Sequence, residues 1–299
     1  MNQELKLAIG EIGISIRWEG SRIIGWPHPA YEKFITDTKP KISLDVLCQG
    51  LPRHSSRLLF DGKAEGNWRL YQNNSGYIIE TFDTLTRKKN KVCFVSPDFR
   101  KCEVYVDPRL ERFHTLRKIF RRHTSWSFPL LMQPLGQLLL VNVLADEGGF
   151  MAHGLGINDR GKGIAFLGGS GTGKSTLAGY WEGQEKVNIL SDEHIIIRKK
   201  DGQFLLYGTP WPGMAMAASS ESVALDHIFF IEHATENKIL GQGSTGDLMP
   251  HLFLPFWDKE RLNIVLEFCE DLFKTLKWKK LGFSKDKSVV EFVRRGQEA

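Results

Sequence analysis

The sequence predicts an α/β protein in two parts: a β-rich α+β domain over residues 1–130 and an α/β domain over residues 131–299. Two observations predict this division. Short runs of alternating apolar and polar residues fill roughly the first 107 positions, a pattern typical of half-buried strands. The second part instead alternates helical apolar periodicity with short apolar runs, one of which leads into a glycine-rich segment and a helical pattern.

The N-terminal region reads as a series of strands separated by turn residues. Hairpin-like punctuation occurs at Asp61-Gly62, Asn74-Ser75-Gly76, Lys89-Asn90 and Pro97-Asp98. The sequence therefore predicts an antiparallel, β-rich region, and it contains no motif that indicates chemistry. The expected strands lie at residues 5–9, 12–16, 67–71, 77–82, 92–95 and 102–106.

A cluster of basic residues follows near 109–123, where arginines and lysines alternate with leucine and phenylalanine. This spacing predicts an amphipathic basic helix. Two interpretations stay open: a solvated face above a core stripe, or a docking face for an acidic partner or nucleic acid. No other feature of the chain favours nucleic acid.

The second part begins with a helical apolar pattern that starts near Pro134 and ends near Gly148-Gly149. Two strands are expected next, over 150–157 and 161–167, joined by a turn at Asn158-Asp159-Arg160-Gly161. Further strands are expected at 195–198, 204–207 and 228–232, and an apolar helix at about 259–277.

The glycine-rich segment follows the second of these strands and matches G-x-x-x-x-G-K-[ST]. Glycines let a backbone curl around phosphates with its N–H groups pointing inward, and a following helix adds a favourable dipole. The segment therefore predicts an ATP site. Lys174 would reach the β- and γ-phosphates, and the Ser175 hydroxyl would ligate Mg²⁺. The expected nucleotide-binding residues are Gly168, Gly169, Ser170, Gly171, Thr172, Gly173, Lys174, Ser175 and Thr176.

A short apolar strand at 187–190 ends in Ser191-Asp192-Glu193-His194. One crossover helix and a parallel strand fit between Lys174 and Asp192, which would place Asp192 at a strand end beside the loop. We therefore expect Asp192 to be a second Mg²⁺ ligand or a catalytic group.

Four motifs together resemble the HPr kinase/phosphorylase superfamily: HGLGI at 153–157, GGSGTGKST at 168–176, LSDEH at 190–194 and GTPWPG at 208–213. The loop is also similar to that of ATP-dependent phosphoenolpyruvate carboxykinase. The resemblance spans residues 153–232, and the first 130 residues do not match the N-terminal domain of HPr kinase. It implies a phosphoenolpyruvate carboxykinase-like P-loop core with a mixed sheet.

The resemblance also implies roles for individual residues. Lys174 and Ser175 match the phosphate-binding and metal-binding positions, Asp192 matches the first acidic residue of the family's pair, and Glu193 stands where the family has a second aspartate. His153 matches a histidine near the γ-phosphate. The Glu-Ile-Arg-Gly segment of true HPr kinases has no counterpart, and GTPWPG at 208–213 instead resembles the divergent branch of that superfamily.

These features predict an Mg²⁺- and ATP-dependent kinase that phosphorylates a hydroxyl group, most plausibly serine of a protein or peptide, or else a small hydroxyl compound. Asp192, Glu193 or His153 would take or orient the acceptor's proton. The alternative is an ATP-binding switch or assembly NTPase without a dedicated acceptor. A carboxykinase ranks third, because the chain is short for that family.

Bulk properties set the remaining expectations. The composition, 41% apolar and 25% charged, is that of an ordinary globular chain, and the apolar runs are too short to cross a bilayer. The four cysteines form no C-x-x-C pair. Without a signal-peptide pattern, we expect a cytoplasmic protein without a membrane partner, and by analogy with HPr kinase a homo-oligomer.

Overall fold

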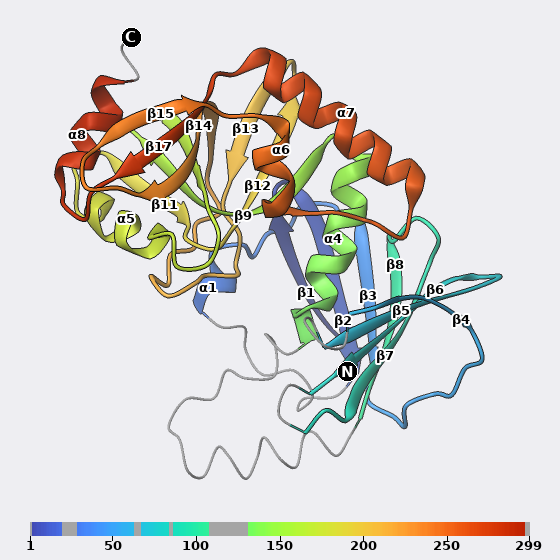
Figure 1. Cartoon of the computed structure of the whole chain (residues 1–299). Coiled ribbons are helices and arrows are strands. Elements are labelled where there is room, and N and C mark those ends of the chain that lie inside the picture. Colours follow the sequence, from blue (N-terminus) through green and yellow to red (C-terminus); the bar gives the residue numbers. More distant parts are fainter. Residues whose placement is uncertain (1, 20–28, 63–66, 84–85, 108–130, 297–299) are drawn as a thin grey trace. The chain divides into compact units, whose positions relative to one another are not determined.

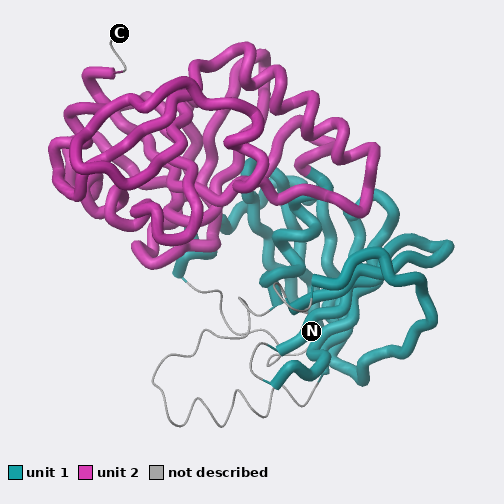
Figure 2. Tube along the Cα trace, in the orientation of Figure 1, with its two compact units in different colours: residues 1–143 teal, residues 144–299 magenta. Residues whose placement is uncertain are grey.

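The computed structural model describes residues 2–19, 29–62, 67–83, 86–107 and 131–296. The chain forms two compact units, residues 1–143 and 144–299 (Figure 2). This division lies 13 residues beyond the expected boundary after residue 130, because the first part of the helix Leu135–Asp146 (α4) groups with unit 1. The expected basic helix near 109–123 lies outside the described residues.

Unit 1 is built on an eight-stranded sheet with the order β1-β2-β3-β8-β7-β6-β5-β4 (Figure 1). Most neighbours are antiparallel, as expected, but β2–β3 and β3–β8 are parallel, which the expectation of an antiparallel region did not include. The long connection through the short helix Pro29–Glu32 (α1) lets β3 run alongside β2 in the same direction. The strands are Asn2–Ile9 (β1), Ile12–Glu19 (β2), Ile42–Leu47 (β3), Arg57–Asp61 (β4), Trp68–Asn73 (β5), Gly76–Phe82 (β6), Lys89–Val95 (β7) and Lys101–Val106 (β8).

Only some of the turns of unit 1 lie where glycine and asparagine residues in the sequence predict a turn. Gly10 and Glu11 both have positive φ and form the two-residue turn between β1 and β2. Lys89 and Asn90, expected as a turn, instead begin β7, and the chain turns before them through a hydrogen bond from the N–H of Asp83 to the carbonyl of Lys88.

Unit 2 contains a nine-stranded mixed sheet in which two long strands, Gly149–Asp159 (β9) and Ser222–His233 (β14), each take part in several ladders. β10 pairs with β9 on one side and with β14, in parallel, on the other. The remaining strands are Lys162–Leu167 (β10), Val187–Ser191 (β11), His194–Lys200 (β12), Gln203–Tyr207 (β13), Lys238–Gln242 (β15), Leu252–Phe253 (β16) and Trp278–Phe283 (β17).

Helices cover this sheet with apolar faces at helical spacing. Lys259–Thr275 (α7) confirms the expected C-terminal helix and buries Val265, Cys269 and Leu272 in one core. Lys174–Trp181 (α5) and Ser288–Arg295 (α8) pack into a second core. Two short turns, Thr245–Leu248 (α6) and Met249–His251 (η1), lead into β16. None of the helices in the described ranges is long and apolar enough to cross a membrane.

The strand expected to run parallel beside the glycine-rich loop is β11. It runs in the same direction as β10, but β9 lies between the two, so β11 pairs antiparallel with β9 and not with β10. The β9–β11 ladder contains a one-residue irregularity between Ile189 and Ser191, after which β12 continues along the same edge of β9.

Candidate functional site

The glycine-rich loop connects the end of β10 to the first residue of α5. Gly171 and Gly173 have φ of 81° and 100°, a region that side chains rarely adopt. A Cβ on Gly173 would also lie 2.6 Å from Cζ of Phe283, and one on Gly168 would lie 2.4 Å from Oγ1 of Thr172. The backbone path of the loop therefore requires glycine at these three positions.

The N-terminus of α5 faces this loop without a side-chain cap. Its N-cap residue is Gly173, which has no side chain to accept hydrogen bonds from the first turn. The first N–H groups of a helix have no acceptor within the helix, so those of Lys174, Ser175 and Thr176 remain available. Burial of Leu177 and Trp181 fixes the helix orientation. The arrangement suits an anion at the helix start.

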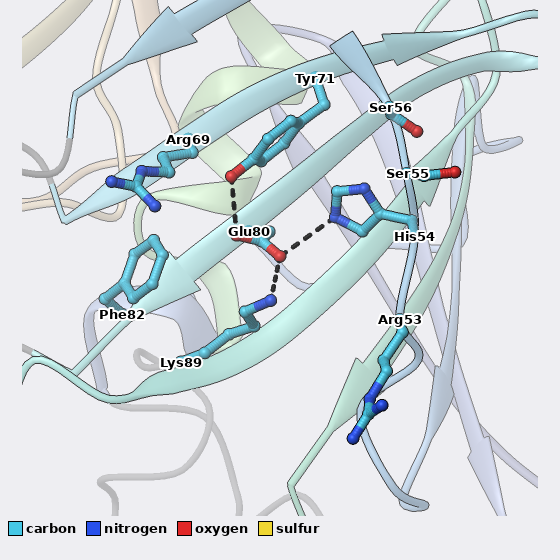
Figure 3. Close-up of a pocket in the computed structure, with 9 residues that line it drawn as sticks. All are labelled: Arg53, His54, Ser55, Ser56, Arg69, Tyr71, Glu80, Phe82 and Lys89. Carbon is cyan, nitrogen blue, oxygen red and sulfur yellow. Dashed lines mark hydrogen bonds and ion pairs between the residues drawn. The ribbon is translucent and has the colours of Figure 1, made fainter. Parts of the chain in front are cut away.

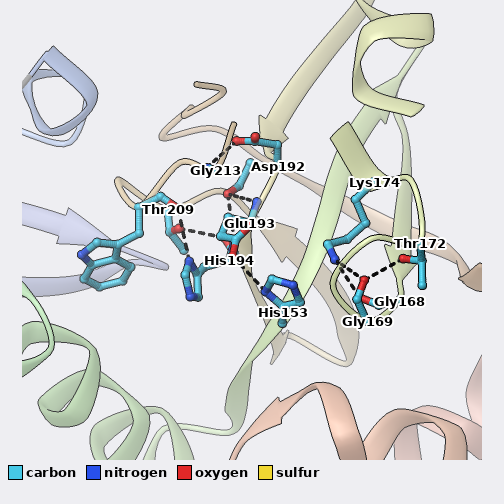
Figure 4. Close-up of polar contacts among 12 residues, drawn as sticks. His153, Gly168, Gly169, Thr172, Lys174, Asp192, Glu193, His194, Thr209 and Gly213 are labelled. Atoms are coloured by element: carbon cyan, nitrogen blue, oxygen red, sulfur yellow. Dashed lines mark hydrogen bonds and ion pairs between the residues drawn. The ribbon is translucent and has the colours of Figure 1, made fainter. Parts of the chain in front are cut away.

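Lys174 folds back over the loop (Figure 4). Its Nζ donates hydrogen bonds to the carbonyl oxygens of Gly168 at 2.7 Å and Gly169 at 3.1 Å. The residue is only 7% exposed, and burial lowers the pKa of its ammonium group while the charge of Glu193 opposes that shift. The Lys174 ammonium group is therefore held beside the backbone of the glycine-rich loop.

Asp192 is buried and anchors a loop of unit 2. Its carboxylate accepts backbone N–H groups from Gly213 at 2.9 Å, Ala215 at 2.6 Å and Ala217 at 3.2 Å. No motif in the sequence indicates this role. A carboxylate has about four lone-pair sites, so three bonds leave little room for another partner.

Glu193 and His153 form a pair beside Lys174. Nδ1 of His153 lies 3.3 Å from Oε1 of Glu193, and the two side chains are 26% and 37% exposed. Burial, followed by the charge of Lys174, lowers the pKa of His153 to about 4. Burial raises the pKa of Glu193, Lys174 opposes this, and Asp192 adds to it. With its pKa lowered to about 4, the His153 imidazole is neutral near pH 7, so the 3.3 Å contact joins a neutral ring to the Glu193 carboxyl group.

Two further histidines belong to the same region, and the sequence interpretation missed them as site residues. His194 lies with its ring centroid 6.1 Å from that of His153, and its Nδ1 is 3.3 Å from the carbonyl of Trp211. His251 lies on η1. Burial is the main cause that lowers the pKa of His194 and of His251, and the charge of Lys174 lowers both further. The LSDEH motif contained the signal for His194, whereas His251 lies in a three-residue turn without any motif.

The GTPWPG segment supports the same site. Oγ1 of Thr209 donates to the carbonyl of His194 at 2.7 Å. A Cβ on Gly213 would lie 2.7 Å from Oε2 of Glu193 and 2.9 Å from Oδ2 of Asp192, so a larger residue there would displace at least one of the two carboxylates.

The expected metal ligands Ser175 and Asp192 are not joined by a hydrogen bond. Ser175 is exposed on the first turn of α5, whereas Asp192 is buried under the 213–217 loop. Across the described ranges, no three His, Cys, Asp or Glu side chains gather in a way that could hold a metal ion. Mg²⁺ bound with nucleotide needs no such cage, since it takes one or two protein ligands together with phosphates and water. Ser175 therefore fits this group, and Asp192 fits with one oxygen site at most.

Comparisons with known proteins add little. No protein-family model matches the chain, and no curated protein matches it. Among solved structures, the chain is similar to the HPr(Ser) kinase/phosphatase from Coxiella burnetii, with 10% sequence identity over 50% of this chain and 92% of that one. The TM-score of this match is 0.27.

Proposed function

We propose that unit 2 is an Mg²⁺- and ATP-dependent kinase of the divergent HPr-kinase-related branch that transfers the γ-phosphoryl group to a hydroxyl, with serine of a protein or peptide as acceptor. One observation carries this proposal: Lys174 sits over an uncapped helix start and lies within electrostatic range of the Glu193–His153 pair. Cation, free amides and a carboxylate are the parts that phosphoryl transfer requires.

The loop amides and Lys174 would hold the β- and γ-phosphates. On nucleotide binding, the Lys174 ammonium would exchange its bonds to the carbonyls of Gly168 and Gly169 for phosphate oxygens. Bound Mg²⁺ would offset charge on the transferring group, with Ser175 as its protein ligand and Asp192 as the second.

Glu193 is the carboxylate best placed to accept the acceptor's proton. Asp192 already accepts three backbone N–H groups, whereas Glu193 is more exposed and, among the described residues, its carboxylate pairs with His153. His153 would be a positioning residue that directs the carboxylate toward the acceptor.

The experiment is incubation of purified protein with a host-cell lysate, Mg²⁺ and γ-labelled ATP, followed by mass spectrometry of labelled products. Wild type should label an acceptor, Lys174→Ala should not, and Lys162→Ala, a matched change at an exposed lysine of β10, should label normally. Full labelling by Lys174→Ala would refute the assignment. Hydrolysis without a labelled acceptor would favour the ATP-dependent switch instead.

A further inference from the structure

A polar cavity lies on unit 1, far in sequence from the glycine-rich loop (Figure 3). Its volume is about 640 Å³, within the usual range for small-molecule sites. The lining comes from the segment before β4 and from β5, β6 and β7: Arg53, His54, Ser55, Ser56, Arg69, Tyr71, Glu80, Phe82 and Lys89.

Glu80 forms the fixed base of this cavity. It is 3% exposed and accepts hydrogen bonds from Nε2 of His54 at 3.1 Å, from the hydroxyl of Tyr71 at 3.1 Å and from the ammonium group of Lys89. Figure 3 shows these three donors converging on the carboxylate. A buried carboxylate with three donors holds their side chains in place.

The lining carries more positive than negative charge. Arg53, Arg69 and Lys89 contribute three cations and Glu80 one anion, a surplus of two positive charges. Arg69 is partly matched by Asp61, 2.9 Å from its Nη2, and its guanidinium lies 5.5 Å from the Phe82 ring centre. Arg53 makes no hydrogen bond or ion pair with any described residue, so its five N–H donors remain available.

His54 contributes a buried ring nitrogen that has no hydrogen-bond partner within the described residues. Its side chain is 10% exposed, and Nδ1 is buried without a hydrogen-bond partner within the described part of the chain. Nε2 faces the Glu80 carboxylate and therefore carries a hydrogen, which leaves the lone pair of Nδ1 without a donor among the described residues. A buried polar atom without a partner costs about 1–3 kcal/mol.

We propose that this cavity binds the phosphate group of a phosphomonoester. A phosphate monoester carries about −1.5 to −2 charges near neutral pH, which matches the surplus of the lining better than a carboxylate does. The fork of Arg53 suits two phosphate oxygens, and Tyr71 and Phe82 offer apolar surface to the body of the ligand. The ester could be a free metabolite or a phosphorylated side chain, because the same group is recognised in both.

The test is calorimetric titration of the full chain with phenyl phosphate, with excess Mg²⁺ and ADP present to occupy the glycine-rich loop. Wild type should bind saturably, and Arg53→Ala should weaken binding at least tenfold. The matched control is Arg57→Ala, a nearby exposed arginine outside the lining that contacts Gln72 at 3.3 Å, and it should bind like wild type. Thermal melts should show that both variants fold, since both side chains are exposed.

Each further outcome decides the proposal. Absence of saturable binding, equal binding of benzoate, or equal weakening by both arginine variants would overturn it, as would loss of the signal when Mg²⁺ and ADP are added. A phosphotyrosine peptide that binds tighter than phenyl phosphate in an Arg53-dependent manner supports the proposal and identifies the source as a phosphorylated chain. The reverse order supports it with a small metabolite as the source. Failure of the kinase assay leaves these outcomes unaffected.

Discussion

The backbone N–H of Ala215 donates to Oδ2 of Asp192 at 2.6 Å, and this bond ties the β11–β12 junction to an exposed loop. Met214 and Met216, the neighbours of Ala215, are 89% and 61% exposed. The buried carboxylate thus acts on the shape of the loop as well as on the charge of the site. Loss of activity in an Asp192 variant would by itself not separate the two effects.

Asp192→Ala should release the 213–217 loop. Three N–H groups would lose their acceptor, and bonds to a charged group are worth about 1.5–3 kcal/mol each, so we expect faster cleavage there by a broad-specificity protease. Mass mapping of early fragments measures this. Ser175→Ala, which removes only the other proposed metal ligand, should be cleaved like wild type. Unchanged cleavage of Asp192→Ala would show that the carboxylate does not hold the loop.

Glu193→Gln should slow phosphoryl transfer by about 10²–10⁴-fold, the usual contribution of a general base. The expected cost in folding stability is under about 1 kcal/mol, because a partly exposed pair contributes little. Single-turnover labelling and thermal melts measure the two quantities. His153→Gln should be impaired less, since a glutamine N–H can still orient Glu193. Labelling at the wild-type rate by Glu193→Gln would exclude it as the base.

Gly173→Ala should weaken nucleotide binding and lower the free energy of unfolding by about 1–3 kcal/mol. Gly173 has a left-handed backbone conformation, and the added Cβ would collide with Phe283 and His233. Gly179→Ala is the matched control on α5. A Cβ there meets nothing within 4 Å, so the helix should gain about 0.5–1 kcal/mol. Thermal melts and titration with a fluorescent ATP analogue give both values. A Gly173→Ala protein that binds nucleotide normally would contradict the loop geometry.

Deprotonation of the buried Lys91 should raise the free energy of unfolding of unit 1 at alkaline pH. Burial lowers its pKa from 10.5 to about 8, and Nζ donates to the carbonyls of Leu131 at 3.4 Å and Gln133 at 3.2 Å. Between these two pH values the unfolded chain binds more protons than the folded one, so the free energy of unfolding rises with pH, by at most about 3 kcal/mol. Lys91→Met should lack this rise in urea melts at pH 7.5 to 10. Equal slopes for both proteins would refute the assignment.

The parts of the structure that depend on local signals could be predicted from the sequence. The glycine-rich loop, α4 and α7 follow from glycine positions and helical periodicity, and the structure has them close to the expected residues. The role of Asp192 could not be predicted, because its partners lie more than 20 residues away on backbone N–H groups, which no side-chain pattern encodes.

The pairings and sites that join distant segments were missed for the same reason. The strands β3 and β4 were not expected, and the parallel pairs of β3 depend on a crossover that hydrophobic alternation does not reveal. The cavity of unit 1 gathers residues from four separate segments between Arg53 and Lys89. The N-terminal region therefore contains no motif that indicates chemistry, although its sheet brings the charged residues of the cavity close to one another.

The irregularity between Ile189 and Ser191 decides which residues of β9 lie opposite the two adjacent acidic residues, Asp192 and Glu193. Side chains alternate along a strand, so one extra residue shifts every later residue by one place against its partner strand. With the shift, His194 stands opposite His153 and the carbonyl of Glu193 accepts the N–H of Gly154. A regular ladder would bring Glu193 opposite His153 and Asp192 opposite Gly154. The one-residue register shift thus places two adjacent carboxylates in different surroundings. Asp192 holds the 213–217 loop, and Glu193 lies within electrostatic range of Lys174.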